Sequence, residues 1–198
     1  TNPSLDPGQA NIITGVKPAA LAFEAGELDC PQVGADTLAR YTKNMPDGTG
    51  IAVAGELQYM WMGMNTEHPK LQDQKVRRAI QHAVDVDSIL AGAYSGTTAK
   101  SNGIICPGLI GQRDSTRYYS YDPAKARALL DEAGVSDLQL TLRTLNNQER
   151  LLAAQIIQAN LGAVGITVSV LPLDSGPFWE MGQENKGDGW GAKLGGAI

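Results

Sequence analysis

The chain has 198 residues, a formal net charge of -5, 42% hydrophobic residues and 19% charged residues. This length can bury a full-sized core without cross-links, and no stretch reaches the roughly 18 uninterrupted apolar residues that a membrane-spanning helix requires. The lysines and arginines are scattered singly instead of forming a basic stripe, which argues against nucleic acid and favours small solutes or proteins as partners.

The first 30 residues predict two short strands and one short helix. Residues 12–13 and 28–30 indicate the strands, and residues 18–25 indicate the helix. On the second strand Glu27 and Asp29 would point to the same side, as the two carboxylates of an acid–base pair do. Acidic residues at the end of a strand usually have no catalytic role, so we do not expect catalysis at Glu27 and Asp29.

A longer strand is predicted at residues 57–65. Aromatic side chains fall on one of its faces and methionine side chains on the other. A strand that is apolar on both faces is typical of the centre of a sheet. We therefore expect this segment to be a central strand.

Two neighbouring helices follow that strand. Asp73 begins the first, whose apolar residues share one face, and Asp85 caps the second. His82 stands beside the apolar stripe of the first helix, so we expect it on a partly exposed edge, where a structural role is far more common than a catalytic one.

A long loop is predicted at residues 96–121, where glycine and proline are frequent. Loops of this length are usually functional. The helix that follows begins with Asp122 as its cap and Pro123 at its first position, and it stops at Gly134.

The clearest unit is a strand, a helix and a strand in succession. Leucines alternate with polar residues at 138–143, and valines and an isoleucine do so at 166–171. The helix between them begins after Asn147 and ends at Gly165. Short joints make this a βαβ unit, in which the strands are parallel and the crossover is right-handed. Three alternating glycines at 187–191 fit a turn before a final strand better than a phosphate-binding loop.

The two cysteines, Cys30 and Cys106, lie far apart, and each precedes a proline. This spacing fits neither a C-x-x-C redox pair nor a zinc ribbon. Two interpretations stay open with equal weight: inert cysteines in loops, or a structural disulfide formed in an oxidising compartment. A thiol enzyme would need one of them beside His82 as the base.

Several stretches together resemble a known family. Residues 76–80, VRRAI, followed by residues 83–89, AVDVDSI, resemble the VRxAI and AIDRxxI pattern of the family 5 extracellular solute-binding proteins, which bind dipeptides, oligopeptides or nickel. Residues 23–29, 121–134 and 161–168 resemble three further stretches of that family. Their order and spacing cover most of the chain, although Val86 stands where the family usually carries arginine.

The resemblance implies an α/β fold: a periplasmic-binding-protein-like lobe with a mixed β-sheet flanked by helices and a right-handed βαβ unit. We expect residues 1–198 to form a single lobe, the C-terminal lobe of a two-lobed protein, with loop 96–121 on its cleft side. Because the chain starts at Thr1 without a signal-peptide pattern, we expect a processed or excised piece that lacks the other lobe.

The function that the resemblance implies is the substrate-binding component of an ABC importer. Such a protein is not an enzyme; it binds a peptide, a chelate or a similar small solute between two lobes and delivers it to a membrane permease. The implied location is the periplasm, or the cell exterior with a lipid anchor in a Gram-positive source. The alternatives are a self-contained α/β enzyme with a cysteine nucleophile and an interaction domain that holds no solute.

Residues that line a cleft lie on loops at strand ends, and these loops supply the candidate solute contacts. The candidates are Pro31, Gln32, Val33, Gly34, Asn102, Gly103 and Ile104. An ordinary surface loop explains them equally well. We expect no catalytic residue, metal ligand or cofactor. Because residues 28–30 and the long loop should both reach the cleft side, Cys30 and Cys106 are expected to have Cα atoms within about 7 Å, close enough for a bridge.

Overall fold

The computed structural model describes residues 13, 15–52, 60–103, 105, 109–113, 119–184 and 192–196, with side chains as far as residue 180. The chain divides into two compact units, with the boundary between Ala54 and Gly55. We call residues 1–54 unit 1 and residues 55–198 unit 2. That all 198 residues belong to one lobe stays a prediction.

Within residues 15–52, unit 1 has two short helices, α1 (Val16–Glu24) and α2 (Ala35–Lys43). The Tyr41 hydroxyl donates a hydrogen bond to Glu24 Oε1 at 2.8 Å, and Arg40 forms an ion pair with the same carboxylate. The hydrogen bond from Arg40, and then that from Tyr41, lowers the pKa of Glu24. This shared carboxylate connects the two helices.

The strand predicted at residues 28–30 is wrong. The chain leaves α1 through Gly26, which has φ +75°, and the Glu27 amide donates to the Ala22 carbonyl at 2.8 Å. This turn closes the end of the helix, and Pro31 soon follows it, so no strand forms. Glu27 and Asp29 are therefore not paired on a strand. Of the predicted strand at 12–13, residue 13 is not in a strand and residue 12 lies outside the described residues.

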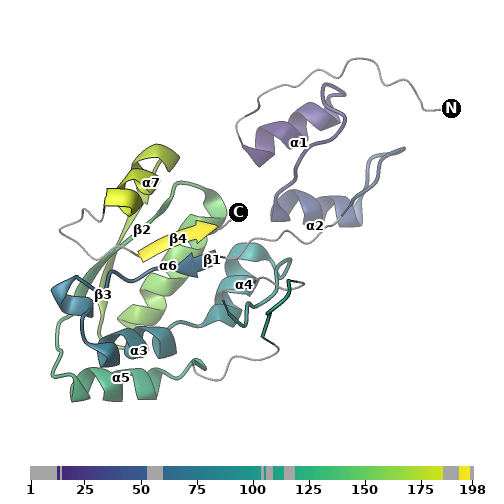
Figure 1. Cartoon of the computed structure of the whole chain (residues 1–198). Helices are drawn as coiled ribbons and strands as arrows, with labels where there is room; N and C mark the ends of the chain where they lie inside the picture. The colour runs from purple at the N-terminus through teal and green to yellow at the C-terminus, as the bar shows by residue number, and fades with distance from the viewer. Residues whose placement is uncertain are drawn as a thin grey trace. The chain divides into compact units, whose positions relative to one another are not determined.

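In the described residues, unit 2 is built on a four-stranded mixed sheet (Figure 1). The strands are β1 (Met60–Met62), β2 (Gln139–Leu145), β3 (Thr167–Leu173) and β4 (Ala192–Gly196), in the order β1-β4-β2-β3. β2 runs parallel to β3 and to β4, whereas β1 runs antiparallel to β4. The predicted mixed sheet and the predicted parallel pair are both confirmed.

β1 is not central in the described part of the sheet, contrary to the prediction; it lies at one end. Met60 and Met62 pack against the core, which explains one apolar face. On the other face the Trp61 ring lies over Gly63 and leaves no room there for a Cβ atom. The second apolar face therefore reflects packing within the strand segment itself and not a neighbouring strand.

The helix α6 (Gln148–Gly162) connects β2 to β3, as the sequence predicts. Asn147 Oδ1 accepts a hydrogen bond from the Arg150 amide at 3.0 Å, and Gly165 has φ +89° in the turn after the helix. Ala153, Ile157 and Leu161 are buried in the same cluster as the inward-facing residues of β2 and β3.

The remaining helices of unit 2 complete its core. They are the 3-10 helix η1 (Pro69–Leu71), α3 (Gln74–Ala83), α4 (Val86–Tyr94), α5 (Pro123–Glu132) and α7 (Ser175–Glu184). Asp73, Asp85 and Asp122 cap α3, α4 and α5 with their carboxylates, which confirms three predicted helix starts. α7 follows β3 directly, and α3 and α5 lie toward the opposite end of β2 (Figure 1).

The Asp85 cap predicts a pH dependence of stability. The hydrogen bond from the Ser88 hydroxyl is the main cause that lowers the pKa of Asp85, with smaller contributions from the Ser88 and Asp87 amides and from Lys100. Because the folded-state pKa lies below the ordinary value of about 3.9, this stabilisation is present above that pH and is lost as the pH falls further. Denaturant unfolding between about pH 7 and pH 3 should show a steeper acid loss for the native chain than for Asp85→Asn, which keeps an acceptor but does not titrate. Parallel curves would contradict this.

Candidate functional site

The carboxyl ends of β2 and β3 lie at the same edge of the sheet. We call residues 145–147 and 173–175 the carboxyl edge. The Asn146 amide donates to the Leu173 carbonyl at 2.9 Å, which ties the two strand ends together. α6 and α7 both begin here. In open α/β sheets ligands bind outside the carboxyl ends of the strands, so this edge is the candidate site of unit 2.

Tyr94, Glu149 and Arg150 form a polar cluster at this edge. Glu149 and Arg150 stand in the first turn of α6, and Tyr94 is the last residue of α4. Burial raises the pKa of Tyr94 and lowers the pKa of Arg150, and the charges of Glu149 and Arg150 both act on Tyr94. The cluster therefore holds a half-buried guanidinium, a carboxylate and a phenol within interaction distance.

β1 supplies a wall to this cluster. The Tyr94 hydroxyl donates to Met60 Sδ at 3.1 Å. In the sheet, Leu194 of β4 pairs with Met62 on one side and with Thr144 on the other. Met60 pairs with Gly196, which is two residues further along β4. Met60 is therefore level with the end of β2, and its thioether faces the same layer as the start of α6.

Thr144 is the last fully buried residue of β2, on the same face as Leu140 and Leu142. Its exposed fraction is 0%, and within the described part of the chain its hydroxyl has no hydrogen-bond partner. A buried hydroxyl without a partner is costly, so this position carries local strain directly beneath the carboxyl edge.

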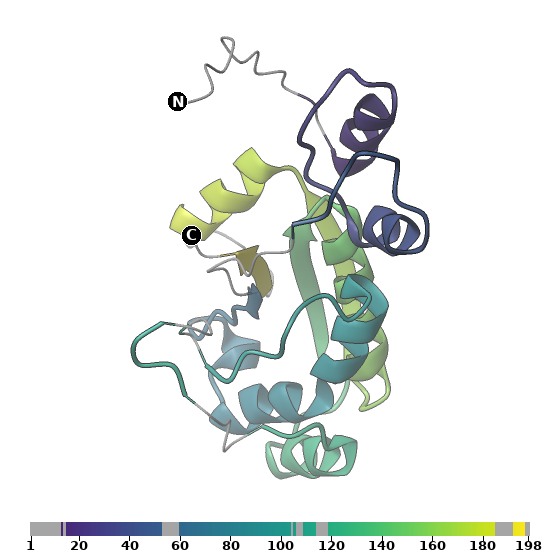
Figure 2. The same ribbon diagram turned by 90° about the vertical axis from the view of Figure 1, so that its right-hand side faces the viewer.

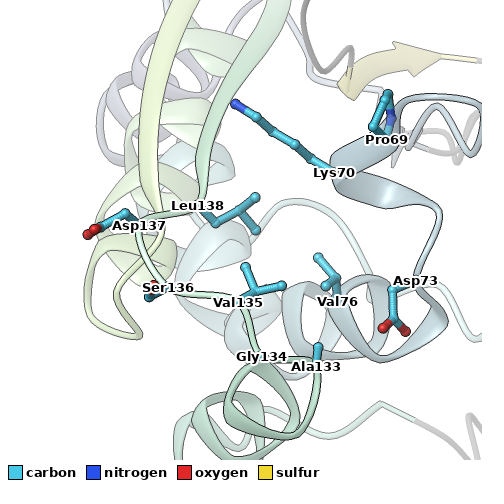
Figure 3. A pocket seen from close by; sticks show the side chains of 10 residues that line it. All are labelled: Pro69, Lys70, Asp73, Val76, Ala133, Gly134, Val135, Ser136, Asp137 and Leu138. Carbon is cyan, nitrogen blue, oxygen red and sulfur yellow. The ribbon is translucent and has the colours of Figure 1, made fainter.

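A pocket of about 340 Å³ opens at the other end of β2 (Figure 3). The side chains of Val76, Val135 and Leu138 point into it, and the Lys70 side chain extends across it toward the strands. Lys70 Nζ donates to the Gln139 carbonyl at 2.9 Å. This pocket lies at the amino end of β2, away from the edge where α/β sheets bind solutes, and its apolar floor belongs to the core.

The first group of predicted contacts lies in unit 1. Pro31, Val33 and Gly34 are half-buried, Gln32 is exposed, and the four residues lead directly into α2 with Gly34 as its N-terminal cap position. They are side by side in the chain and on a loop, as expected. Their contact with a solute stays a prediction.

The second group lies in the long loop of unit 2. Asn102 is half-buried and Gly103 is exposed, and the Ser101 hydroxyl donates to the Gly103 carbonyl at 2.5 Å; Ile104 lies outside the described residues. Just before them, Lys100 forms an ion pair with Asp87 at 3.2 Å. Their role as solute contacts also stays a prediction, and the two groups belong to different units.

Cys30 is exposed and forms no disulfide with any residue that the structure describes; Cys106 lies outside those residues, so their pairing stays a prediction. His82 is buried and not on a partly exposed edge as expected. Its Nδ1 lies 2.9 Å from the Ser120 carbonyl, and its ring makes an edge contact with Tyr119. The end of the long loop thus covers the side of α3 that the helical pattern alone leaves open.

Neither a metal cluster nor a membrane-spanning helix is found among the described residues. No group of three or more His, Cys, Asp or Glu side chains is arranged to hold a metal ion in that part of the chain. None of the helices described there is both long enough and apolar enough to cross a membrane.

A comparison of the sequence with models of protein families identifies the family of this chain. The model of the bacterial extracellular solute-binding proteins, family 5 Middle, matches residues 1–196. The chain belongs to this family. The resemblance that residues 76–80, 83–89 and three further stretches indicate is thereby confirmed for this family 5 solute-binding protein chain.

Its relatives are peptide-binding proteins and a metal-chelate binder. The chain is 30% identical over 132 residues to the dipeptide-binding protein of Escherichia coli strain K12, which covers 64% of this chain and 25% of that protein. The structure of NikA from Brucella suis in complex with Fe(III)-EDTA matches with a TM-score of 0.77 and 26% identity, over 93% of this chain and 40% of that one.

The fold of a third protein is also shared. DppA from Helicobacter pylori, in complex with the peptide STSA, has a TM-score of 0.82 at 24% identity, over 94% of this chain and 36% of that one. The predicted α/β fold of a periplasmic-binding-protein lobe is thus confirmed. The family 5 chain spans a quarter of the E. coli relative and less than half of the two solved structures.

Sequence reasoning missed the Tyr94–Arg150 cluster. Asn146 and Asn147 could have been placed at the carboxyl edge, because they stand between the predicted strand at 138–143 and the helix that follows it. Tyr94 could not, because only the packing of α4 on α6 brings it to a residue 56 positions later in the chain.

The buried hydroxyl of Thr144 gives a stability prediction. Thr144→Val keeps the shape of the side chain and removes the polar atom, so the free energy of unfolding should rise by about 1 kcal/mol. Thr144→Ser keeps the hydroxyl and removes a methyl group, so it should lower that free energy by about 1 kcal/mol. Urea unfolding of the three proteins measures both changes. A destabilised valine variant would mean that the hydroxyl has a partner.

Proposed function

We propose that this family 5 chain is part of the substrate-binding component of an ABC importer, which binds a peptide or a similar small solute and delivers it to a membrane permease. The observation that carries the proposal is the family match over residues 1–196. The dipeptide-binding relative supports a peptide as solute, and the NikA likeness keeps a metal chelate as the alternative.

The carboxyl edge is what unit 2 contributes to the solute site. Asn146 and Asn147 have exposed side chains there, and the Tyr94–Arg150 cluster offers a phenol and a guanidinium. A half-buried guanidinium interacts more strongly with an anionic group than an exposed one, because less water screens it. Backbone amides and a few polar side chains are all that reversible binding requires.

The candidate thiol and its candidate base give no support to catalysis. The candidate base His82 is buried, and its Nδ1 lies 2.9 Å from the Ser120 carbonyl; of the two candidate thiols, Cys30 is exposed and Cys106 lies outside the described residues. We therefore propose a binding protein without enzymatic activity, located in the periplasm or at the outer cell surface, as the family description implies. A second lobe and the permease are its proposed partners.

The affinity of the 198-residue chain alone should be at least about a hundredfold weaker than that of the longer polypeptide that contains it. A solute enclosed by two lobes buries most of its surface only when both are present, and a loss of about 3 kcal/mol corresponds to that factor. Isothermal titration of both proteins with a dipeptide and a tetrapeptide measures the difference. Equal affinities would show that these residues hold the whole site and that the two-lobed proposal is wrong.

Arg150 should contribute to solute binding. Arg150→Ala in the longer polypeptide should weaken peptide binding by about tenfold or more, because a hydrogen bond to a charged group contributes about 1.5–3 kcal/mol. The matched control is Arg127→Ala on α5, whose guanidinium contacts the Ala163 carbonyl at 3.3 Å. Titration should show an unchanged affinity for the control. An unchanged affinity for both variants would remove the cluster from the solute site.

A further inference from the structure

The large exposed apolar side chains of the described residues are concentrated in one segment. Nine such side chains are exposed, and five of them lie between residues 105 and 121: Ile105, Leu109, Ile110, Tyr119 and Tyr121. The exposed fraction of Ile110 is 103%, the largest of the nine. Scattered exposed apolar residues need no explanation, but a local concentration marks an interaction surface.

Ile110 stands in a defined turn. The Gln112 amide donates to the Leu109 carbonyl at 3.1 Å, and Gly111 has φ +94°, as the third position of a type II turn requires. Ile105 packs so closely against Gly111 that its Cδ1 lies 3.1 Å from where a Cβ atom would be. We call Leu109–Gln112 the apolar turn. The hydrogen bond between Gln112 and Leu109 and the contact between Ile105 and Gly111 keep the Ile110 side chain exposed to solvent.

The loop that carries the apolar turn is fastened at both of its ends. At its start the Thr97 hydroxyl donates to the Tyr94 carbonyl at 2.6 Å, and Lys100 pairs with Asp87. At its end the Ser120 carbonyl lies 2.9 Å from His82 Nδ1. The described part of the loop projects from the rest of unit 2 (Figure 2). A fastened loop presents its tip to a partner at a reduced cost in conformational entropy.

We propose that the apolar turn packs against polypeptide of the same protein that lies outside these 198 residues. This inference rests on the proposed function, because it takes the chain as one portion of a longer solute-binding protein. The contact it adds is an anchor between this chain and the remainder, made by Ile110 and Leu109, and it is separate from the carboxyl edge.

The remaining polypeptide is the occupant that the comparisons favour. The family model that matches the chain is described as the middle of the family 5 proteins. The chain spans 25% of the E. coli relative and 40% of the NikA chain. Most of the length of these two relatives thus has no counterpart in the chain. A small solute is a poor occupant, because solute sites are concave and the tip of a turn is convex. A second copy is also a poor one, because a stable dimer buries roughly 800 Å² on each partner, far more than one turn offers.

Carbene footprinting with mass spectrometry tests the contact directly. Residues 109–110 should be labelled strongly in the 198-residue chain and at least about fivefold less in the longer polypeptide, because a buried side chain is closed to the reagent. Equal labelling in the two proteins would overturn the proposal. Protection that arises only at high concentration, together with a larger mass in light scattering, would also overturn it, since a second copy would then be the occupant.

A matched pair of variants gives an independent measurement. Ile110→Ser should leave the melting temperature of the 198-residue chain unchanged and lower that of the longer polypeptide by about 2 °C or more. The control Arg113→Gln, an exposed polar residue of the same loop, should change neither. A loss in both proteins, or in neither, would contradict the proposal.

Peptide titration of the same longer polypeptide separates this inference from the proposed function. Peptide binding with an unprotected turn overturns the anchor alone. A protected turn without binding of either a peptide or a metal chelate overturns the proposed function and leaves the anchor standing.

Discussion

The parallel pairing of β2 with β3 through α6 is the constraint on which unit 2 depends. Seven residues of one strand face seven of the other, from Gln139 opposite Thr167 to Leu145 opposite Leu173. Because the strands point the same way, both end at one edge, and the helices that follow both start there. This places amides, a carboxylate and a guanidinium together without any long loop, while the opposite end of β2 is left to apolar packing between α3 and α5.

Local patterns in the sequence predict the parallel pair and the helices α1, α3, α4, α5 and α6, for a physical reason, whereas no prediction covers α2 or α7. Capping by Asp73, Asp122 and Asn147 involves residues two or three positions apart, so the sequence displays donor and acceptor together. The place of β1 depends on pairing Met60 with Gly196, 136 positions later, and no local pattern encodes that. At residues 28–30 a local pattern predicted a strand that does not form, because the turn that ends α1 occupies this segment.

The candidate site also has one part that the sequence predicts and another part that depends on contacts between distant segments. The alternation of apolar and polar residues predicts strands at 138–143 and 166–171, and β2 and β3 each run two residues further, so the sequence places the carboxyl edge to within two residues. Tyr94 reaches it only through the packing of α4 on α6, and His82 is buried only because Ser120 and Tyr119 return across α3. Side chains whose surroundings come from distant segments are those that sequence patterns place least well. The loop residues around Gln32 and Asn102 belong to different units, and no local pattern relates them.

The indole of Trp61 stacked over Gly63 also gives the sheet a natural optical reporter. Since the ring lies on the backbone of its own segment, its emission depends on whether that segment keeps its extended course beside β4. Any side chain at position 63 would displace the ring. The strand β1 therefore carries its own fluorophore, one of three tryptophans in the chain, and replacing Trp179 and Trp190 by phenylalanine would leave its emission as the reporter of that strand.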